Sequence, residues 1–314
     1  MSVHLQKAKV FKAIRNYFEL TGAVEVFTDI LREYPNLDSN VYPVEVEFWD
    51  SGGNRRKGYL HTSPEYEMKI ILSHIKQDIY QITKVFRNYE GSSRHKVEFT
   101  MLEWYRVGYN LDDLMEDTVN IFVQSAISLY KKSKIVFGNR VYDLSNWEKI
   151  TVDEAFYRYT GVYPDSYDAL IDFLYKSDMK HSGIDEMDWE TAFFTVYAFY
   201  VEPNLGKEKP AFIYNYPPEM SALAKVQNGK GKRFEGYING LELVNGYYEE
   251  NDYKEIKKRL SLDIKRKKEE TGKDFPIDEK FLESLKNLPE CSGASLGIDR
   301  LLMVLLNKKN IKDI

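Results

Sequence analysis

Two glutamates in one predicted β-hairpin carry the strongest chemical signal in the sequence. Asn239-Gly240 stands between two apolar runs, which is typical of a two-residue hairpin turn. Such a turn pairs Tyr237 with Glu242. It also pairs Glu235 with Val244, which puts the two glutamates on one face, diagonal to each other and roughly 7 to 8 Å apart. Carboxylates this close repel unless a cation lies between them, and Mg²⁺ with phosphates suits such ligands. A solvated sheet edge with two ordinary glutamates is the alternative.

A third glutamate, Glu249, follows seven residues after Glu242. Strict alternation along a strand would put these two side chains on opposite faces. A one-residue bulge at Asn245-Gly246 would bring Glu249 back to the face of Glu235 and Glu242. We therefore expect the three glutamates to line one pocket floor.

The segment 97–107 predicts a second strand with an unusual face. The residues that share this face by period two are Phe99, Met101, Glu103 and Tyr105. A buried face that carries Glu and Tyr between Phe and Met suits a binding pocket better than a plain core. The alternative turns the opposite face inward, with Glu98, Thr100 and Arg106.

Two arginines stand where strands end. Arg87 precedes the loop 88–94 and could grip a phosphate with both guanidinium nitrogens. Arg300 follows the small-residue run 293–299, which allows a ligand close to the backbone. The sequence contains no glycine-rich Gly-Lys-Ser/Thr phosphate loop, and its five histidines lack the spacing of metal ligands.

The elements expected around these residues are mostly hairpins and flanking helices, so we predict an α+β fold with an antiparallel sheet. The periodicity predicts helices near 5–21, 64–75, 111–130, 279–285 and 299–306, and a basic helix after residue 250. It predicts strands at 44–48, 59–60, 79–86, 97–107, 211–214, 233–249 and 292–296. The segment 143–200 looks mostly helical and without obvious chemistry.

Length and composition fit one catalytic domain over residues 1–314. The net charge of −5 disfavours a protein that wraps nucleic acid. The tract 254–273 holds nine basic and four acidic residues; it is either a solvated helix face or a surface for an acidic partner. Cys291 is the only cysteine, expected to be a packed small residue. No signal peptide or membrane span is apparent, so we expect a cytoplasmic protein.

Several segments resemble the motifs of a known family, in the same order. KVFRNYEGSSRHKVEFTMLEWY resembles motif 2 of class II aminoacyl-tRNA synthetases, and SGASLGIDRLLM resembles motif 3. HTSPEYEMK and FEGYINGLELVNGYYE are similar to the lysyl branch. Over nearly its full length the chain most resembles the short paralogues of lysyl-tRNA synthetase that attach β-lysine to a lysine of translation elongation factor P. No segment precedes the first helix, so we expect no amino-terminal anticodon-binding domain.

The resemblance implies a role for each matching residue. Arg87 and Arg300 would be catalytic, on the α- and γ-phosphates. Glu235 and Glu242 would hold Mg²⁺. The residues implied in ATP binding are Arg87, Asn88, Tyr89, Phe99, Glu242, Leu243, Gly297 and Arg300. The residues implied in amino-acid binding are Ser63, Pro64, Glu65, Tyr105 and Glu249, with Glu65 on the α- or β-ammonium and Tyr105 and Glu249 on the ε-ammonium.

The chain departs from the family pattern at four places. Tyr89 replaces a glutamate that helps seat ATP, and Glu90 follows it; Lys96-Val97 replaces Asn-Pro. Asp29 replaces the proline of motif 1, the motif that builds the family's dimer. Ser295 stands where the tRNA ligases have Gly and the protein-modifying paralogues have Ala, beside the amino-acid pocket.

The expected function is ATP-dependent activation of lysine or β-lysine and transfer to elongation factor P, by a homodimer that does not use tRNA. A truncated lysyl-tRNA ligase is disfavoured by the acidic charge and the missing anticodon domain. An asparagine-synthetase-like ammonia ligase is disfavoured by Tyr105 and Glu249. A degenerate paralogue that senses nucleotide or amino acid is the non-enzymatic alternative, and Tyr89 is its best support.

Overall fold

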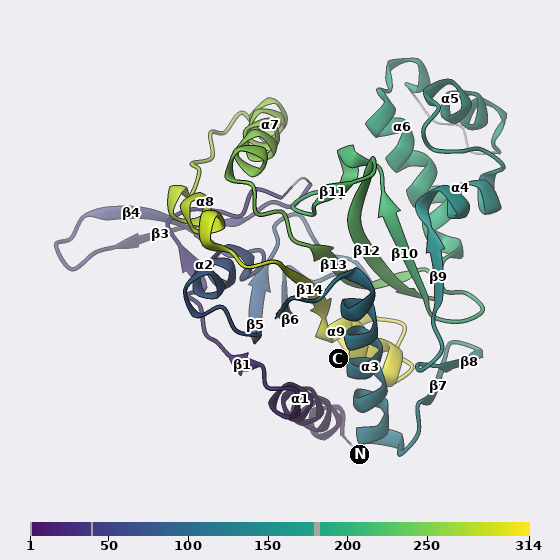
Figure 1. Cartoon of the computed structure of the whole chain (residues 1–314), viewed down its shortest axis with the longest axis horizontal. Helices are drawn as coiled ribbons and strands as arrows, with labels where there is room; N and C mark the ends of the chain where they lie inside the picture. Colours follow the sequence, from purple (N-terminus) through teal and green to yellow (C-terminus); the bar gives the residue numbers. More distant parts are fainter. Residues whose placement is uncertain (1, 39, 179–182) are drawn as a thin grey trace.

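A large mixed sheet forms the centre of the protein in the computed structural model, which describes residues 2–38, 40–178 and 183–314 (Figure 1). Within these residues the sheet has nine strands, and all pairs are antiparallel except the two at its ends, β1 with β5 and β10 with β9. In sheet order the strands are β1 (Val24–Glu25), β5 (Ile79–Phe86), β6 (Glu98–Val107), β14 (Cys291–Gly297), β13 (Leu241–Tyr248), β12 (Lys230–Ile238), β10 (Ala211–Tyr216) and β9 (Glu148–Thr151), with β11 (Val226–Gln227) beside β12. A mostly antiparallel sheet flanked by helices confirms the predicted α+β fold class.

One face of the sheet is closed by three helices, α1 (Val3–Leu20), α3 (Leu111–Tyr130) and α9 (Ile298–Leu305). Leu102 and Trp104 of β6 point into this core and are fully buried. Because side chains alternate along a strand, Glu103 and Tyr105 must point to the other face. The cavity therefore lies on the predicted face of β6. The face named as the alternative is buried too, with Thr100 4% exposed and Arg106 in an ion pair with Asp117 at 2.8 Å.

The opposite face is covered at its two ends and hollow between them (Figure 1). At one end a second hydrophobic cluster joins α2 (Glu65–Ile75), α7 (Tyr253–Thr271) and α8 (Glu279–Ser284) to β5, β6 and β14. At the other end a third cluster joins α4 (Val152–Thr160), α5 (Tyr167–Lys176) and α6 (Trp189–Val196) to β9, β10 and β12. The small sheets β2 (Leu31–Arg32) with β4 (Arg55–Leu60) and β3 (Val44–Trp49), and β7 (Lys134–Phe137) with β8 (Arg140–Asp143), lie outside this arrangement.

The β12–β13 hairpin has the predicted turn but not the predicted register. Tyr237 pairs with Glu242 as expected, whereas Glu235 pairs with Asn245 and not with Val244. The extra residue of the bulge is therefore Leu243, and the bulge predicted at Asn245-Gly246 is wrong. Gly246 is needed for another reason, because a Cβ there would lie 2.4 Å from the ring of Phe234.

The segment 143–200 contains more than the predicted helices. It supplies the edge strand β9, and Tyr197 at its end forms a hydrogen bond with Glu235. Residues 179–182 of this segment lie outside the described residues. Cys291 is buried, as predicted. Among the described helices, none combines the length and hydropathy that a membrane span requires.

Candidate active site

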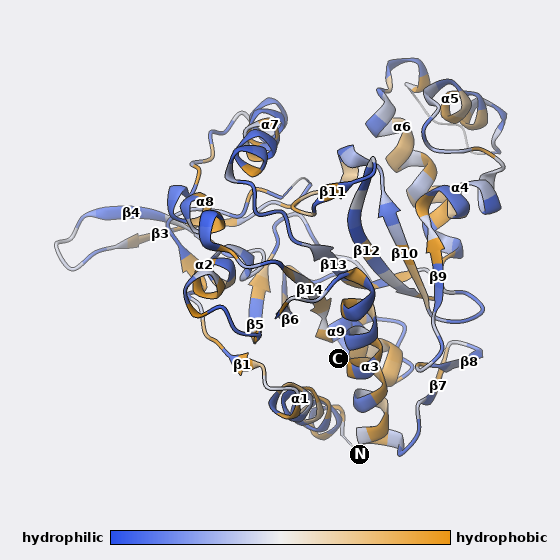
Figure 2. Ribbon diagram, viewed as in Figure 1, coloured by the Kyte–Doolittle hydropathy of each residue, from blue (hydrophilic) through white to orange (hydrophobic). Residues whose placement is uncertain are grey.

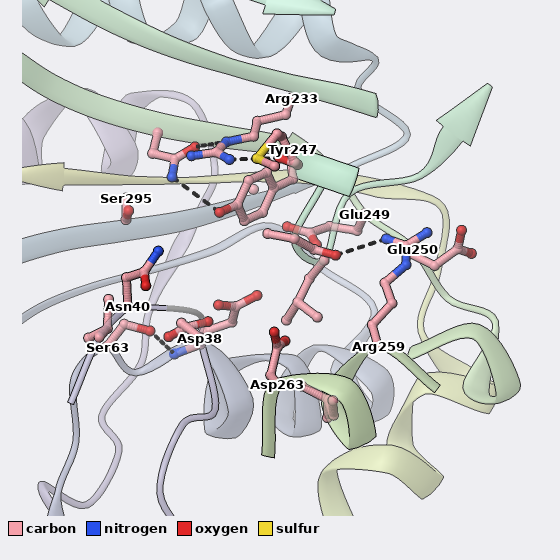
Figure 3. A pocket seen from close by; sticks show the side chains of 18 of the residues that line it. Asp38, Asn40, Ser63, Arg233, Tyr247, Glu249, Glu250, Arg259, Asp263 and Ser295 are labelled. Atoms are coloured by element: carbon pink, nitrogen blue, oxygen red, sulfur yellow. Dashed lines mark hydrogen bonds between the residues drawn. The ribbon is translucent and has the colours of Figure 1, made fainter. Parts of the chain in front are cut away.

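A cavity of about 810 Å³ occupies the hollow face of the sheet, between α2 and α7 on one side and α6 on the other (Figure 3). Among the described residues its lining includes eleven acidic and five basic side chains. This formal excess of six negative charges exceeds the net charge of the entire chain, which is −5. A cavity of this kind attracts cationic ligands, since low-dielectric walls concentrate the field of the charges that line it.

Three buried carboxylates form the most acidic part of this cavity. Glu65 starts α2, Glu103 lies on β6, and Glu249 follows β13; their exposed fractions are 8%, 3% and 2%. The buried ammonium of Lys69 lies between two of them, 2.6 Å from Glu65 Oε1 and 2.7 Å from Glu249 Oε2. Lys69 is four residues after Glu65 on the same helix face, so α2 supplies both members of the pair, of which Glu65 lines the cavity.

Glu103 leaves one carboxylate oxygen without a partner. Tyr105 donates a hydrogen bond of 2.6 Å to Glu103 Oε1, while Oε2 is buried and accepts none. Burial raises the pKa of Glu103, and the neighbouring Glu65 raises it further. Burial also raises the pKa of Glu249, whereas the Lys69 ammonium opposes that increase. An additional cation or hydrogen-bond donor in the cavity would therefore satisfy Glu103.

Gly293 and Ser295 of β14 form the floor beside these carboxylates. A Cβ at Gly293 would lie 2.3 Å from the ring of Tyr105 and 2.8 Å from Glu249 Oε1. Only glycine at this position leaves both groups in place. Ser295 pairs with Glu103 on one side and with Asn245 on the other, which puts its side chain in the lining of the cavity.

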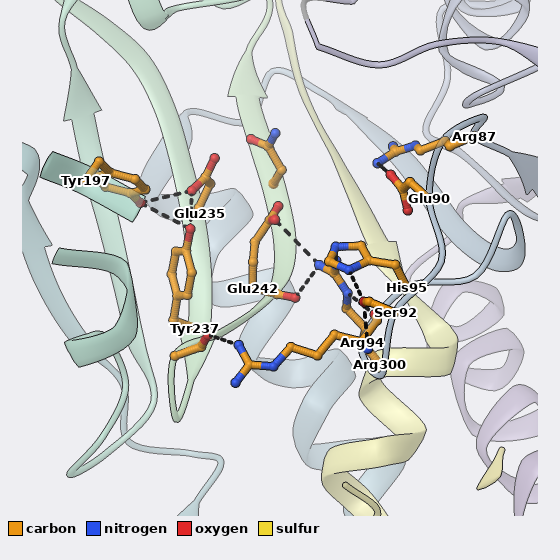
Figure 4. A network of polar contacts seen from close by, with 12 residues as sticks. Arg87, Glu90, Ser92, Arg94, His95, Tyr197, Glu235, Tyr237, Glu242 and Arg300 are labelled. Carbon is orange, nitrogen blue, oxygen red and sulfur yellow. Dashed lines mark hydrogen bonds and ion pairs between the residues drawn. The ribbon is translucent and has the colours of Figure 1, made fainter. Parts of the chain in front are cut away.

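Arg87 lies at the other end of the cavity, at the end of β5. Its Nε donates to the carbonyl oxygen of Thr62 at 3.3 Å, and its guanidinium lies 5.3 Å from the ring centroid of Phe99. Glu90 lies 4.0 Å from Arg87, whereas Tyr89 has a positive φ of 60° and is 79% exposed (Figure 4). The glutamate that faces the arginines is thus Glu90, one residue after the position at which the family has it.

Arg300 is held by groups from two other elements. It donates to the carbonyl oxygen of Glu242 at 2.8 Å and contacts His95 Nε2 at 2.5 Å (Figure 4). Burial and the nearby arginines lower the pKa of His95 to about 4, so its ring is neutral at pH 7. A neutral ring with its proton on Nδ1, toward Ser92, can accept from Arg300 through Nε2. His95 therefore orients Arg300.

Glu235 and Glu242 line the same cavity, and burial followed by the charge of Glu235 raises the pKa of Glu242. Glu235 also accepts hydrogen bonds from Arg233, Tyr197 and Tyr237. Within the described part of the chain, no group of three or more metal-ligating side chains exists. Two carboxylates nevertheless fit Mg²⁺, which often uses one or two of them together with substrate phosphates.

The structure brings together most, but not all, of the side chains predicted for the site. Those that line the cavity are Ser63, Glu65, Arg87, Tyr105, Glu235, Glu242 and Glu249. Phe99 and Arg300 lie next to lining residues. Pro64 is the N-cap of α2, and the side chain of Leu243 is buried in the core with α3, so that only its main chain is available to a nucleotide.

The remaining predicted residues lie in the flanking loops. Gly297 is the N-cap of α9 and lies against the side chain of Arg300. Asn88 donates its main-chain N–H to Tyr42, and the exposed ring of Tyr89 packs edge-on against the same tyrosine.

Three functional candidates were not predicted from the sequence: Lys69, His95 and Arg233. Glu103 was predicted to face a pocket, but without a role of its own. The spacing of Lys69 from Glu65 was a usable signal, because residues four apart on a helix are neighbours. The contacts of His95 and Arg233 depend on segments distant in the sequence.

Comparison with known proteins agrees with the fold. The family model described as tRNA synthetases class II (D, K and N) matches residues 2–314. The chain therefore belongs to this family of ATP-dependent amino-acid ligases.

Three individual relatives are similar to this chain over nearly its whole length. An elongation factor P–(R)-β-lysine ligase homolog from Aquifex aeolicus (strain VF5) is 41% identical over 95% of this chain and 93% of its own. The elongation factor P–(R)-β-lysine ligases of Proteus mirabilis (strain HI4320) and Haemophilus influenzae are each 35% identical over 99% of this chain and 93% of theirs.

Proposed function

We propose that this protein activates lysine or β-lysine as the adenylate and transfers the acyl group to a lysine side chain of elongation factor P. The observation that carries the proposal is the buried acidic group formed by Glu65, Glu103 and Glu249 around Lys69. Three carboxylates and one ammonium leave a formal excess of two negative charges.

A diamino acid supplies two ammonium groups, which match this excess. Glu65 would bind the α- or β-ammonium. Glu249 and Tyr105 would bind the ε-ammonium, beside Glu103 Oε2, which has no hydrogen-bond partner. A neutral amino acid such as asparagine would leave buried charges uncompensated, and each unpaired buried ion costs several kcal/mol. The names of the relatives support lysine-like substrates and elongation factor P as the acceptor.

The arginines would carry the chemistry of activation. The substrate carboxylate attacks the α-phosphorus of ATP in line, and pyrophosphate leaves. Arg87 would stabilise the charge that develops on the α-phosphate, and Arg300 would hold the γ-phosphate. Phe99 offers a ring for the adenine. Glu235 and Glu242 would hold Mg²⁺, which supplies a positive charge on the phosphate oxygens.

A homodimer is part of the proposal. The segment that corresponds to motif 1 and its flanks exposes large apolar side chains, with Leu20 at 87% and Phe27 at 78% exposure. A dimer that covered these side chains would remove apolar surface from water. Size-exclusion chromatography with light scattering distinguishes a dimer from a monomer, and a monomer at all concentrations would contradict this part.

ATP–pyrophosphate exchange tests activation directly, with α-lysine, β-lysine, asparagine and aspartate compared at saturating Mg²⁺. Exchange is expected with one or both lysine isomers, and Arg87→Ala is expected to abolish it. Normal exchange in Arg87→Ala would refute the assigned role of the arginine. Folded wild-type protein that binds ATP but exchanges with none of these amino acids would favour the sensor function.

A further inference from the structure

The cavity extends beyond the residues assigned to activation, and this further part has no role in the reaction described so far. Here we define the α6–α7 chamber as the part lined by residues 190–194, 218–226 and 250–266. It lies between α6 and α7 and is continuous with the pocket that contains Glu249 and Glu65. Figure 3 shows Arg259 and Asp263 of α7 together with Glu249 in this lining. A group that enters through the chamber would thus share one continuous cavity with the amino acid.

The walls of the chamber combine apolar and acidic side chains. Phe194, Met220 and Leu262 contribute apolar surface, and Phe194 and Leu262 are 39% and 52% exposed. Five acidic and three basic residues share the lining. This composition suits a long aliphatic chain that ends in an ammonium group. It does not suit a polyphosphate chain, because the formal charge of the chamber is negative.

The basic residues of α7 are largely used within the protein, although the helix is mostly hydrophilic (Figure 2). Arg266 forms a two-pronged ion pair with Glu190, with contacts of 2.6 and 2.7 Å, that joins α7 to α6. Arg259 binds Glu255 and the carbonyl oxygens of Ala222 and Ala224. These two arginines of α7 thus hold the walls of the chamber together.

We propose that the α6–α7 chamber is the entrance for the acceptor, and that its occupant is a lysine side chain on an extended segment of the acceptor protein. The proposal rests on the proposed function, because it presupposes an activated carboxyl group in the same cavity. The lysine ammonium loses a proton, and its nitrogen attacks the carbonyl carbon of the mixed anhydride. The C–N bond forms, the bond from carbon to the phosphate oxygen breaks, and AMP leaves with its electrons. The nitrogen releases a second proton to solvent.

Two variants that place a cation in the chamber test this inference. Leu262→Lys and Phe194→Lys change partly exposed side chains, and Leu5→Lys on α1, where Leu5 is 60% exposed, is the matched control. Three reactions are compared: ATP–pyrophosphate exchange, formation of the hydroxamate with hydroxylamine, and transfer to purified elongation factor P. Hydroxylamine is a small nucleophile that does not need the chamber.

Both chamber variants are expected to keep exchange and hydroxamate formation within about twofold of wild type. Their transfer to elongation factor P is expected to decrease by about tenfold or more, because like charges brought together at an interface are strongly unfavourable. The control variant is expected to retain all three reactions.

Unchanged transfer in both variants would overturn the inference. So would an equal loss of exchange and transfer, since the chamber would then serve activation. Wild-type protein that exchanges with a lysine isomer but loads tRNA instead of elongation factor P would also overturn it. Absence of exchange in wild type would instead refute the proposed function, and circular dichroism spectra of the variants identify any loss of fold.

Discussion

Replacement of Lys69 by Met should remove the only positive charge that the structure places between Glu65 and Glu249. The side chains of Lys69 and Glu249 are 1% and 2% exposed, so solvent screens their 2.7 Å ion pair very little. Removal of one partner of a buried pair typically costs about 3–5 kcal/mol, because the other charge stays buried without compensation. We expect Lys69→Met to lower the free energy of unfolding by this amount at pH 7.

The pH dependence of this loss identifies its cause. Without Lys69, the pKa of Glu249 must increase further, since burial then acts alone with the repulsion from Glu65. A carboxyl group with a raised pKa binds more protons in the folded state, so its effect on stability becomes less favourable as pH rises above the ordinary value of 4.5. Because the pKa of Glu249 is already raised to about 8 with Lys69 present, this group costs both proteins the same stability between pH 4.5 and 8, and the difference between wild type and Lys69→Met should widen only as pH rises above about 8.

Urea unfolding at several pH values measures this difference. Lys84→Met is the matched control, because Lys84 is 46% exposed in its 3.0 Å pair with Glu98, and exposed pairs contribute only about 0–1 kcal/mol. The double variant Lys69→Met/Glu249→Gln removes both charges and should recover part of the loss. A loss for Lys69→Met no larger than that of the control, or one independent of pH, would refute the reasoning. In exchange assays, Lys69→Met should raise the KM for the diamino acid much more than it lowers kcat.

Further predictions concern the floor of the pocket and the support of Arg300. Gly293→Ala should raise the KM for the amino acid by about tenfold or more, because inserting a methyl group into a filled site costs about 1–3 kcal/mol; calorimetry should show unchanged ATP binding, and a normal KM would contradict the contacts of Gly293 with Tyr105 and Glu249. His95→Ala should reduce exchange by about tenfold, since hydrogen bonds to charged groups contribute about 1.5–3 kcal/mol; equal activity would show that Arg300 is oriented without it. The lowered pKa of His95 also predicts that wild type loses stability as pH falls from 6.5 toward 4, and that His95→Ala loses less over this range in thermal unfolding. Ser295→Ala should change the ratio of exchange with α-lysine to that with β-lysine; an unchanged ratio would show that its hydroxyl group does not contribute to the choice of isomer.

The sequence alone determined most of the long strands and the chemical character of the hollow face of the sheet. Alternation along β6 put Glu103 and Tyr105 on the side away from Leu102 and Trp104, and the structure confirms this orientation. The predicted α3 begins and ends at the predicted residues, Leu111 and Tyr130. Such features depend on local periodicity and on which face must be buried, and both can be read from neighbouring residues.

Register and pairing were decided only by the tertiary structure. The bulge lies at Leu243 and not at Gly246, because the latter glycine is required by the close approach of Phe234 from β12. Glu65 and Glu249 share one ammonium from Lys69, although 184 residues separate them in the chain. His95 is neutral because burial and three arginines surround it. Periodicity assigns a side chain to a face, whereas its charge state and partners depend on which distant segments the fold packs against it.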